Sequence, residues 1–280
     1  MKNIIIVILI MLTNRLSIAQ TTVEQTSKLT TRKLVVEKID SVVQQGTTTQ
    51  SPITYFAALY NTMLVEIQAA NATGHFTDSV LIDYIQKNFT AYYLNALTAY
   101  QNNDSVPYAW MAALDTNYCK NCGYVQWLAL GTNAHINNDL YFILLDYFGK
   151  YGVANHNAKK AQKEFFTISA RETDRIVKVF IKTDPKINWI EGVLINTGKN
   201  GVKQQMKKYL RVTWNNALEA TTHPEKLATI TQRQMAFAQK NALQFIKPKF
   251  PIKTGFKMMK SLDNLPFATK ISMLAPVPKK

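Results

Sequence analysis

Glycine and proline are scarce in this sequence, with 10 Gly and 9 Pro among 280 residues. An all-β fold needs a turn about every 8–12 residues, and such turns are rich in these two residue types. Their scarcity, beside many Ala, Leu, Gln, Lys and Asn residues, favours an all-α fold. Hydrophobic residues make up 47% of the chain and charged residues 18%, which is typical of a globular domain and not of a disordered one.

The sequence also lacks the common hydrolase signatures, since it contains neither a GxSxG nor an HExxH motif. Cysteine is rare as well: the two residues present are Cys119 and Cys122. They lie outside the strand-helix-strand context of a thioredoxin-like motif, and two cysteines alone do not complete a tetrahedral zinc site. We therefore expect a small disulfide ring in a loop.

The first nineteen residues have the features of a secretory signal peptide. Lys2 supplies a positive charge, residues 4–12 form an apolar run, and Ser17 and Ala19 place small residues at positions −3 and −1 of a cleavage site. The apolar run is about half as long as a membrane-spanning helix requires. We therefore expect cleavage after Ala19 and a periplasmic or extracellular protein. A retained N-terminal anchor is the alternative.

Charge is distributed unevenly along the chain, whose formal net charge is +15. Residues 151–280 hold 24 of the 33 Lys and Arg residues but 8 of the 18 Asp and Glu residues, so the whole excess lies there. This asymmetry indicates an anionic partner. Outside the cytoplasm we expect anionic lipid or acidic glycan and not nucleic acid. The alternative is a solvated basic surface that keeps the protein soluble.

Capping residues and hydrophobic periodicity predict about eight to ten helices. They are expected at about 21–45, 52–71, 77–100, 110–114, 126–148, 159–182, 188–196, 202–220 and 222–246. Thr222 and Glu225 are expected to form a capping box at the start of the last of these. The prediction is thus a single-domain multi-helix bundle at 20–246, after the signal peptide at 1–19 and before a basic C-terminal segment at 247–280.

The C-terminal segment mixes eight lysines, one aspartate and five prolines with aromatic and aliphatic residues. The prolines break any long helix. Such a segment can lie on a membrane surface, where each lysine near anionic lipid contributes about 1 kcal/mol. Alternatively, it is a strap that packs its apolar side chains on the bundle and leaves its lysines in water.

The helix expected at about 126–148 is apolar around most of its circumference, which predicts that it is the buried centre of the bundle. At about 100° per residue, His135, Asp139 and Asp146 share one face of this helix. A buried carboxylate without partners costs several kcal/mol. These side chains must therefore meet donors, a cation, a metal ion or a water-filled cleft.

Three interpretations of this polar face stay open. In a structural one, His135 and Asp139 pair with each other or with side chains of neighbouring helices, and so fix the register of the bundle. In a catalytic one, His135 is a general acid or base that Asp139 orients. The residues expected to bind substrate are then Asn133, Asn137 and Asp146.

The third interpretation is a divalent metal site. A histidine and an aspartate are suitable ligands, but a metal centre needs a third and a fourth. The candidates for these are His75, His156 and Glu164.

The segment from Asn133 to Leu140 reads NAHINNDL and follows LALG. It resembles the hallmark N-A-H-I-N-x-D-L run of a mostly bacterial, all-helical family that is classed only as a domain of unknown function. The likeness covers roughly residues 50–150, through FAALYNTM, NFTAYYLNAL and the stretch from Pro107 to Trp110. The resemblance implies an all-helical fold and no particular activity. The residues of this sequence that match the family's motif and that the resemblance singles out are Asn133, His135, Asn137 and Asp139.

These observations lead to two hypotheses about function. The first is a hydrolytic or lipid-modifying envelope enzyme that acts on an anionic or amphiphilic substrate through His135 and Asp139. The second is a non-catalytic envelope protein, membrane-peripheral or ligand-binding, whose buried polar network is structural. The substitution His135→Ala distinguishes them: an enzyme would lose turnover with nearly unchanged melting, whereas a structural network would lose stability.

Overall fold

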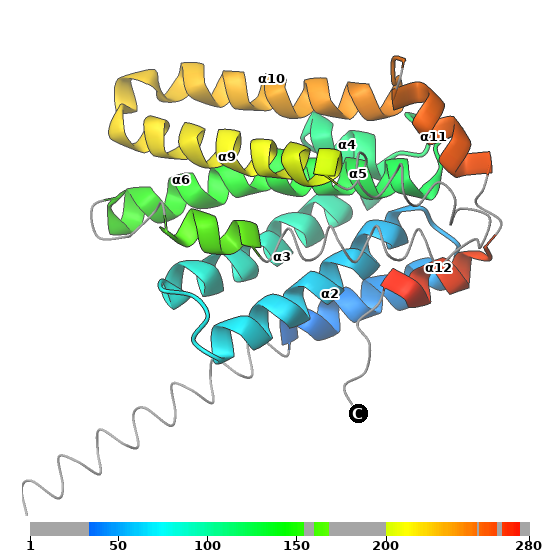
Figure 1. Ribbon diagram of the computed structural model, residues 1–280, viewed down its shortest axis with the longest axis horizontal. Helices are drawn as coiled ribbons and strands as arrows, with labels where there is room; N and C mark the ends of the chain where they lie inside the picture. Colours follow the sequence, from blue (N-terminus) through cyan, green and yellow to red (C-terminus); the bar gives the residue numbers. More distant parts are fainter. Residues whose placement is uncertain (1–33, 154–159, 168–199, 251, 262–264, 275–280) are drawn as a thin grey trace, which may run out of the picture. The chain divides into compact units, whose positions relative to one another are not determined.

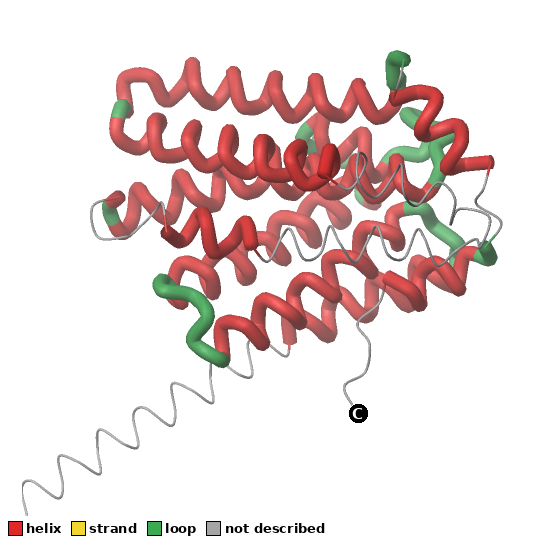
Figure 2. Tube along the Cα trace, viewed as in Figure 1, coloured by secondary structure: helices red, strands yellow, loops and turns green. Residues whose placement is uncertain are grey.

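The computed structural model describes part of the chain. The described residues are 34–153, 160–167, 200–250, 252–261 and 265–274. The chain divides into two units, residues 1–38 and residues 39–280. All regular structure in the described residues is helical, and none of them lies in a strand (Figure 2). The predicted all-α fold is confirmed.

The first helices lie close to their predicted positions. They are α2 (Ile53–Ala72), α3 (Ser79–Gln101) and α4 (Tyr108–Leu114), and before them a helix over 34–48 covers the described part of the helix predicted at 21–45. The turn between α2 and α3 contains Gly74, whose φ of 71° is rarely adopted by residues with a side chain. Asp78 then caps α3, because its carboxylate accepts a hydrogen bond from the Leu81 amide at 2.9 Å.

Two long helices of the C-terminal half form an antiparallel pair. α9 (Asn200–Thr222) and α10 (Leu227–Ile246) are joined through a 3-10 turn, Pro224–Lys226, and lie side by side (Figure 1). The predicted capping box at Thr222 is wrong. Thr222 is the last residue of α9, and its hydroxyl donates to the Leu218 carbonyl of the same helix, so it is not available to cap the next one.

One long helical run forms the centre of the second unit. It consists of α5 (Tyr124–Ala134), the π-helical turn η1 (His135–Asp139) and α6 (Leu140–Tyr151). α5 packs against α2, α4 and α10, η1 against α3, α9 and α10, and α6 against α3 and α9. All five residues of η1 are buried. The prediction of a central buried helix at about 126–148 is confirmed.

The loop before this central run is held by a disulfide and by a capping side chain. Cys119 and Cys122 form the expected disulfide, with Cα atoms 5.2 Å apart. The Gly123 amide donates to the side-chain oxygen of Gln126 at 3.1 Å, while the amide nitrogen of that side chain donates to the Phe245 carbonyl at 2.8 Å. Gln126 therefore caps α5 and joins it to the end of α10.

The C-terminal segment forms two short helices, α11 (Ile252–Ser261) and α12 (Phe267–Leu274). α12 packs on α2, where the Thr62 hydroxyl donates to the Leu274 carbonyl at 2.6 Å. Lys270 is buried, and its ammonium group lies over two tyrosine rings, a favourable cation–π arrangement. This end of the segment is a strap on the bundle, whereas the lysines that precede it are exposed.

Several predicted elements lie wholly or partly outside the described residues. A helix covers residues 160–167, inside the helix predicted at 159–182. The remainder of that prediction, the helix predicted at 188–196 and the signal peptide are not described. Of the helices that are described, none is both long enough and apolar enough to cross a membrane.

Candidate functional site

The π-helical turn η1 positions His135 and Asp139, the two residues predicted to carry chemistry. A π turn holds more residues than an α turn, and such turns occur often at functional sites. Both side chains face the interior of the bundle, since His135 is 2% exposed and Asp139 is 0% exposed. His135 Nδ1 lies 3.3 Å from Asp139 Oδ2, so the two residues form a buried pair.

Three donors surround the Asp139 carboxylate. Trp110 Nε1 of α4 and Asn138 Nδ2 each donate to Oδ1 at 2.9 Å, and His135 faces Oδ2. Burial raises the pKa of Asp139, because the ion loses its hydration, and the donors oppose this rise. The carboxyl group therefore has the hydrogen bonds without which its burial would be costly.

Aromatic rings enclose the His135 imidazole. Their centroids lie 3.7 Å (Phe89, stacked), 4.5 Å (Tyr60), 5.4 Å (Phe56) and 6.3 Å (Trp110) from that of the imidazole. Burial in this cage lowers the pKa of His135, and the neighbouring carboxylate opposes the lowering. The environment thus favours the neutral imidazole.

Two polar atoms in the cage have unused hydrogen-bonding capacity. Among the described residues, none forms a hydrogen bond to His135 Nε2 or to the Tyr93 hydroxyl. Tyr93 belongs to the same cluster, because its ring packs against those of Phe56, Tyr60 and Trp110. An unsatisfied buried polar group costs about 1–3 kcal/mol, so these two atoms are the least stabilised polar groups of the cage.

Asn133 and Asn137 belong to a second network, which ties the central helix to α9 and α10. Asn137 Nδ2 donates to Asn133 Oδ1 at 2.9 Å, and Asn133 Nδ2 donates to the Ala238 carbonyl at 3.0 Å. Gln234 Nε2 donates to the Asn137 carbonyl at 2.6 Å and to the Thr213 hydroxyl at 3.0 Å. Each asparagine amide is therefore already bonded to protein at both its nitrogen and its oxygen.

Sequence reasoning missed Thr213 and Gln234 as members of this network. They lie 76 and 97 residues after Asn137, and only the packing of α9 and α10 brings them to it. A lone Thr or Gln in a helical stretch carries no local sign that it will be buried. The one available signal was its place on the apolar side of an amphipathic helix.

The prediction that Asp146 shares the face of His135 and Asp139 is wrong. Asp146 is exposed, and the hydroxyl of Tyr84 in α3 donates to it. The prediction assumed about 100° per residue throughout, but the π turn adds a residue and so rotates the following helix by roughly that angle. Asp146 therefore lies apart from the buried pair.

The described residues contain no group of three or more His, Cys, Asp or Glu side chains that could hold a metal ion. Glu164 instead accepts hydrogen bonds from the amide and the hydroxyl of Thr77, at 2.9 and 2.7 Å. His75 is exposed in the turn before α3, and His156 lies outside the described residues. The metal site stays a prediction for which the described residues supply no complete ligand set.

A comparison with family models establishes the relationship of this chain to other proteins. The model of a family of unknown function, DUF5995, matches residues 33–248. The chain belongs to the DUF5995 family. The match runs from the helix over 34–48 to just beyond α10 and confirms the predicted membership in an all-helical family of unknown function. Searches of curated proteins and of solved structures gave no match.

Proposed function

We propose that this DUF5995 protein is a non-catalytic envelope protein that binds anionic membrane surfaces. The observation that carries the proposal is the basic tip, which we define as residues 247–257. In the basic tip, Phe250 is 84% exposed and Ile252 is 53% exposed. The lysines around them are also exposed; they are Lys247, Lys249, Lys253 and Lys257.

The composition of the basic tip suits the interface between water and lipid. It contains no Asp or Glu. Each lysine near an anionic surface contributes about 1 kcal/mol, and a large apolar side chain adds binding energy when it enters the boundary of the acyl chains. Pro248 lies two residues before Phe250 and restricts the backbone there, which lowers the entropy lost when the side chain inserts.

The core around His135 supports a non-catalytic role. The imidazole and the carboxylate of Asp139 are closed off by helices and aromatic rings, and the asparagines beside them are bonded to protein. A general acid or base must come within hydrogen-bonding distance of a substrate atom. In the structure, His135 and Asp139 are buried, so a substrate atom cannot come within hydrogen-bonding distance of them. The hydrogen bonds of this core instead join α4, the central helix, α9 and α10.

The compartment is part of the proposal. The predicted signal peptide supports export, and the membrane surface concerned would then be that of the cell envelope. Anionic lipid is the expected partner because the positive charge excess of the whole chain lies in residues 151–280.

Binding to lipid vesicles tests the proposal. The full chain should sediment with vesicles that contain phosphatidylglycerol and not with vesicles of phosphatidylcholine alone, and the binding should weaken as salt is raised. The double variant Phe250→Ser/Ile252→Ser should bind at least about tenfold more weakly, since it loses two inserting side chains.

Val80→Ser is the matched control, because Val80 is 56% exposed on α3, away from the basic tip. It should bind as the wild type does. Thermal melting of each variant checks that folding is intact. Equal binding to neutral and anionic vesicles, or full binding by the double variant, would contradict the proposal.

The unpartnered His135 Nε2 in a π turn favours a second candidate, a hydrolytic or lipid-modifying activity at His135 and Asp139. This candidate requires the aromatic cage to open. The test is to incubate the protein with anionic lipid vesicles and to measure the products released. A wild-type activity that His135→Ala abolishes, with nearly unchanged melting, would establish it.

A further inference from the structure

A cluster of tyrosines reaches the surface where α3 packs against α6. Tyr92 is 37% exposed and Tyr151 is 38% exposed, Tyr84 and Asn88 are half-buried, and Asp146 is exposed. We define the tyrosine platform as these five residues. Neither the proposed membrane contact nor the buried core around His135 uses them.

Contacts beneath and within the tyrosine platform hold its rings in place. The ring centroid of Tyr84 lies 5.1 Å from that of the buried Tyr147 and 6.2 Å from that of Tyr151. The Tyr151 ring also packs on Tyr147, with centroids 4.7 Å apart, and the Lys150 ammonium lies 5.2 Å from its centroid. A ligand that stacks on such pre-positioned rings costs little side-chain entropy.

Asp146 places a carboxylate beside these rings. The Tyr84 hydroxyl donates to Asp146 Oδ2 and so orients the carboxylate. Partial burial and this hydrogen bond raise the pKa of Tyr84 to about 12, so its hydroxyl keeps its proton at neutral pH. A carboxylate can accept about four hydrogen bonds, which leaves capacity for donors from a ligand. The surface next to it is open, because a Cβ atom on Gly149 would meet nothing within 4 Å.

The tyrosine platform is elongated along α3. Tyr84, Asn88 and Tyr92 recur every four residues and so lie near one line, with the first and last about 12 Å apart at 1.5 Å per residue. Asn88 Nδ2 donates to the Tyr84 carbonyl at 2.9 Å, which fixes the amide between the two rings. Burial and the charges of Asp139 and Asp146 raise the pKa of Tyr92, so this second ring also lies within reach of the carboxylate.

Sugars have the chemistry that fits this surface. The face of a phenol ring carries partial negative charge and attracts the C–H groups on the face of a sugar ring. Sugar hydroxyls can donate to the Asp146 carboxylate. A lipid surface or a dry protein interface is a poor occupant, because it would remove water from that carboxylate without supplying donors.

We propose that the tyrosine platform binds an uncharged, β-linked glycan chain, with sugar rings stacked on Tyr84 and Tyr92 and their hydroxyls donating to Asp146. The line of rings along α3 favours a straight chain, as β-1,4 linkages produce, over a curved α-linked one. This binding activity goes beyond the proposed membrane contact and does not depend on it.

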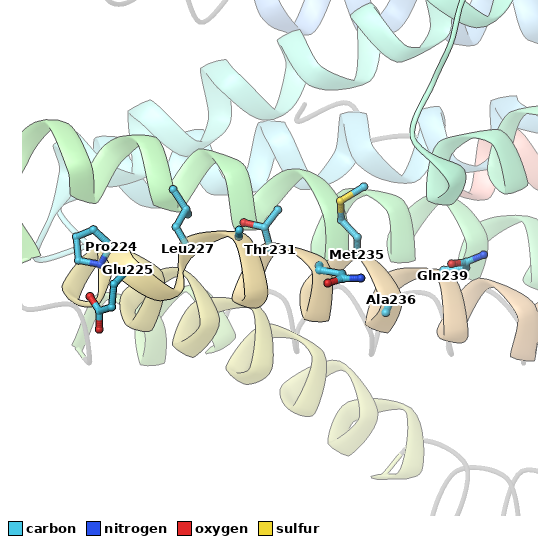
Figure 3. A pocket seen from close by; sticks show the side chains of 9 residues that line it. Pro224, Glu225, Leu227, Thr231, Met235, Ala236 and Gln239 are labelled. Carbon is cyan, nitrogen blue, oxygen red and sulfur yellow. The ribbon is translucent and has the colours of Figure 1, made fainter.

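A groove on α10 lacks these features and supplies a control. It has a volume of about 790 Å³, and Figure 3 shows Leu227, Thr231 and Met235 projecting along it. None of its lining residues is aromatic, so it offers no ring face to a sugar. Met235 is 48% exposed and can be replaced without disturbing the tyrosine platform.

Calorimetric titration of the full chain with tetrasaccharides tests the proposal. Cellotetraose and chitotetraose are straight β-linked chains that differ in their acetamido groups, whereas maltotetraose is α-linked and curved. The protein should bind at least one of the two β-linked chains with a dissociation constant of about 1 mM or lower. It should bind maltotetraose at least about fivefold more weakly.

Two double variants locate the binding. Tyr92→Ala/Asp146→Ala should weaken binding about tenfold or more, because it loses a stacked ring and a charged acceptor. Tyr118→Ala/Asp104→Ala makes the same changes at exposed positions in two loops, and it should bind within about twofold of the wild type. The same is expected of Met235→Ala in the α10 groove. Thermal melting checks that each variant is folded.

The outcomes separate this proposal from membrane binding. Tyr92→Ala/Asp146→Ala should bind phosphatidylglycerol vesicles fully, and Phe250→Ser/Ile252→Ser should bind the sugar fully. Failure to bind either β-linked tetrasaccharide, equal binding of maltotetraose, or full binding by Tyr92→Ala/Asp146→Ala would overturn the proposal. Self-association that this variant abolishes, without sugar binding by the wild type, would assign the platform to a second copy of the chain and would also overturn it.

Discussion

The cage around His135 and the surface formed by α10 and the basic tip contain similar kinds of side chain. These side chains are buried in the cage and mostly exposed on the surface. Both place polar or charged groups beside aromatic and aliphatic side chains. Around His135 the polar groups are buried and are bonded mostly to other protein groups. Along α10 and the basic tip, most of the charges and several apolar side chains are exposed to solvent.

The difference indicates which region is suited to stability and which to binding. A buried carboxylate is tolerated only where fixed donors replace water, so the cage contributes mainly through the stability of the bundle. An exposed Phe among lysines contributes nothing to the core, and its apolar surface can be buried only against a partner. Substitutions in the two regions should therefore affect different measurements.

The largest loss of stability is expected from Asp139→Ala. The substitution leaves Trp110 Nε1, Asn138 and His135 without their shared acceptor in a closed core. We expect the free energy of unfolding to fall by about 3–5 kcal/mol, because three buried polar groups lose their acceptor and each unsatisfied group costs about 1–3 kcal/mol. Urea denaturation measures this change.

Asp146→Ala is the control for that prediction, since Asp146 is exposed and is bonded to Tyr84. It should cost less than about 1 kcal/mol. If the two variants lost the same stability, the cage would not be the stabilising region described here.

The next largest loss of stability is expected from Gly131→Ala, at the point where the central helix contacts the cage. A Cβ atom on Gly131 would overlap the ring of Phe56, which itself packs on His135 and Trp110. Gly131→Ala should therefore destabilise the protein by about 1–3 kcal/mol through overpacking. Gly149→Ala, at a position of α6 with nothing within 4 Å, should instead stabilise it by up to about 1 kcal/mol. Opposite signs in thermal or urea denaturation would confirm the contrast.

The smallest effect is expected in the pH dependence of stability. In Asp139→Asn, His135 remains with a pKa lowered by burial, so the unfolded chain binds more protons below about pH 6.5 and stability should fall from pH 7 to pH 5. In His135→Gln, Asp139 remains with a raised pKa, so the folded chain binds more protons and stability should rise over the same change.

The size of each slope is at most about 1.4 kcal/mol per pH unit for one proton. Both variants are compared with the double variant His135→Gln/Asp139→Asn, which removes both titrating groups and supplies the background. Burial raises the pKa values of Tyr60 and Tyr93, so these neighbours stay neutral in this range. Slopes of the same sign would show that the two side chains are more hydrated than the buried pair described here.

Much of the fold was predictable from local signals. Gly74 and Asp78 mark the turn and the cap between α2 and α3, and apolar periodicity located α3, α10 and the central helix within a few residues. The pairing of His135 with Asp139 was also within reach, because residues four apart on a helix are neighbours. The prediction placed Thr222 at the start of α10, whereas it is the last residue of α9. A threonine hydroxyl at this position could cap the following helix or bond within its own helix, and the sequence fits both arrangements.

The sequence by itself determined the helical class, the order of the helices and the excess of positive charge in residues 151–280, because propensity, periodicity and composition are local properties. Only the tertiary structure decided that a π turn rotates Asp146 out of the site and that Trp110, Thr213 and Gln234 complete the polar core. It also decided which lysines are exposed to solvent. These outcomes depend on packing between segments far apart in the chain, which no local pattern encodes.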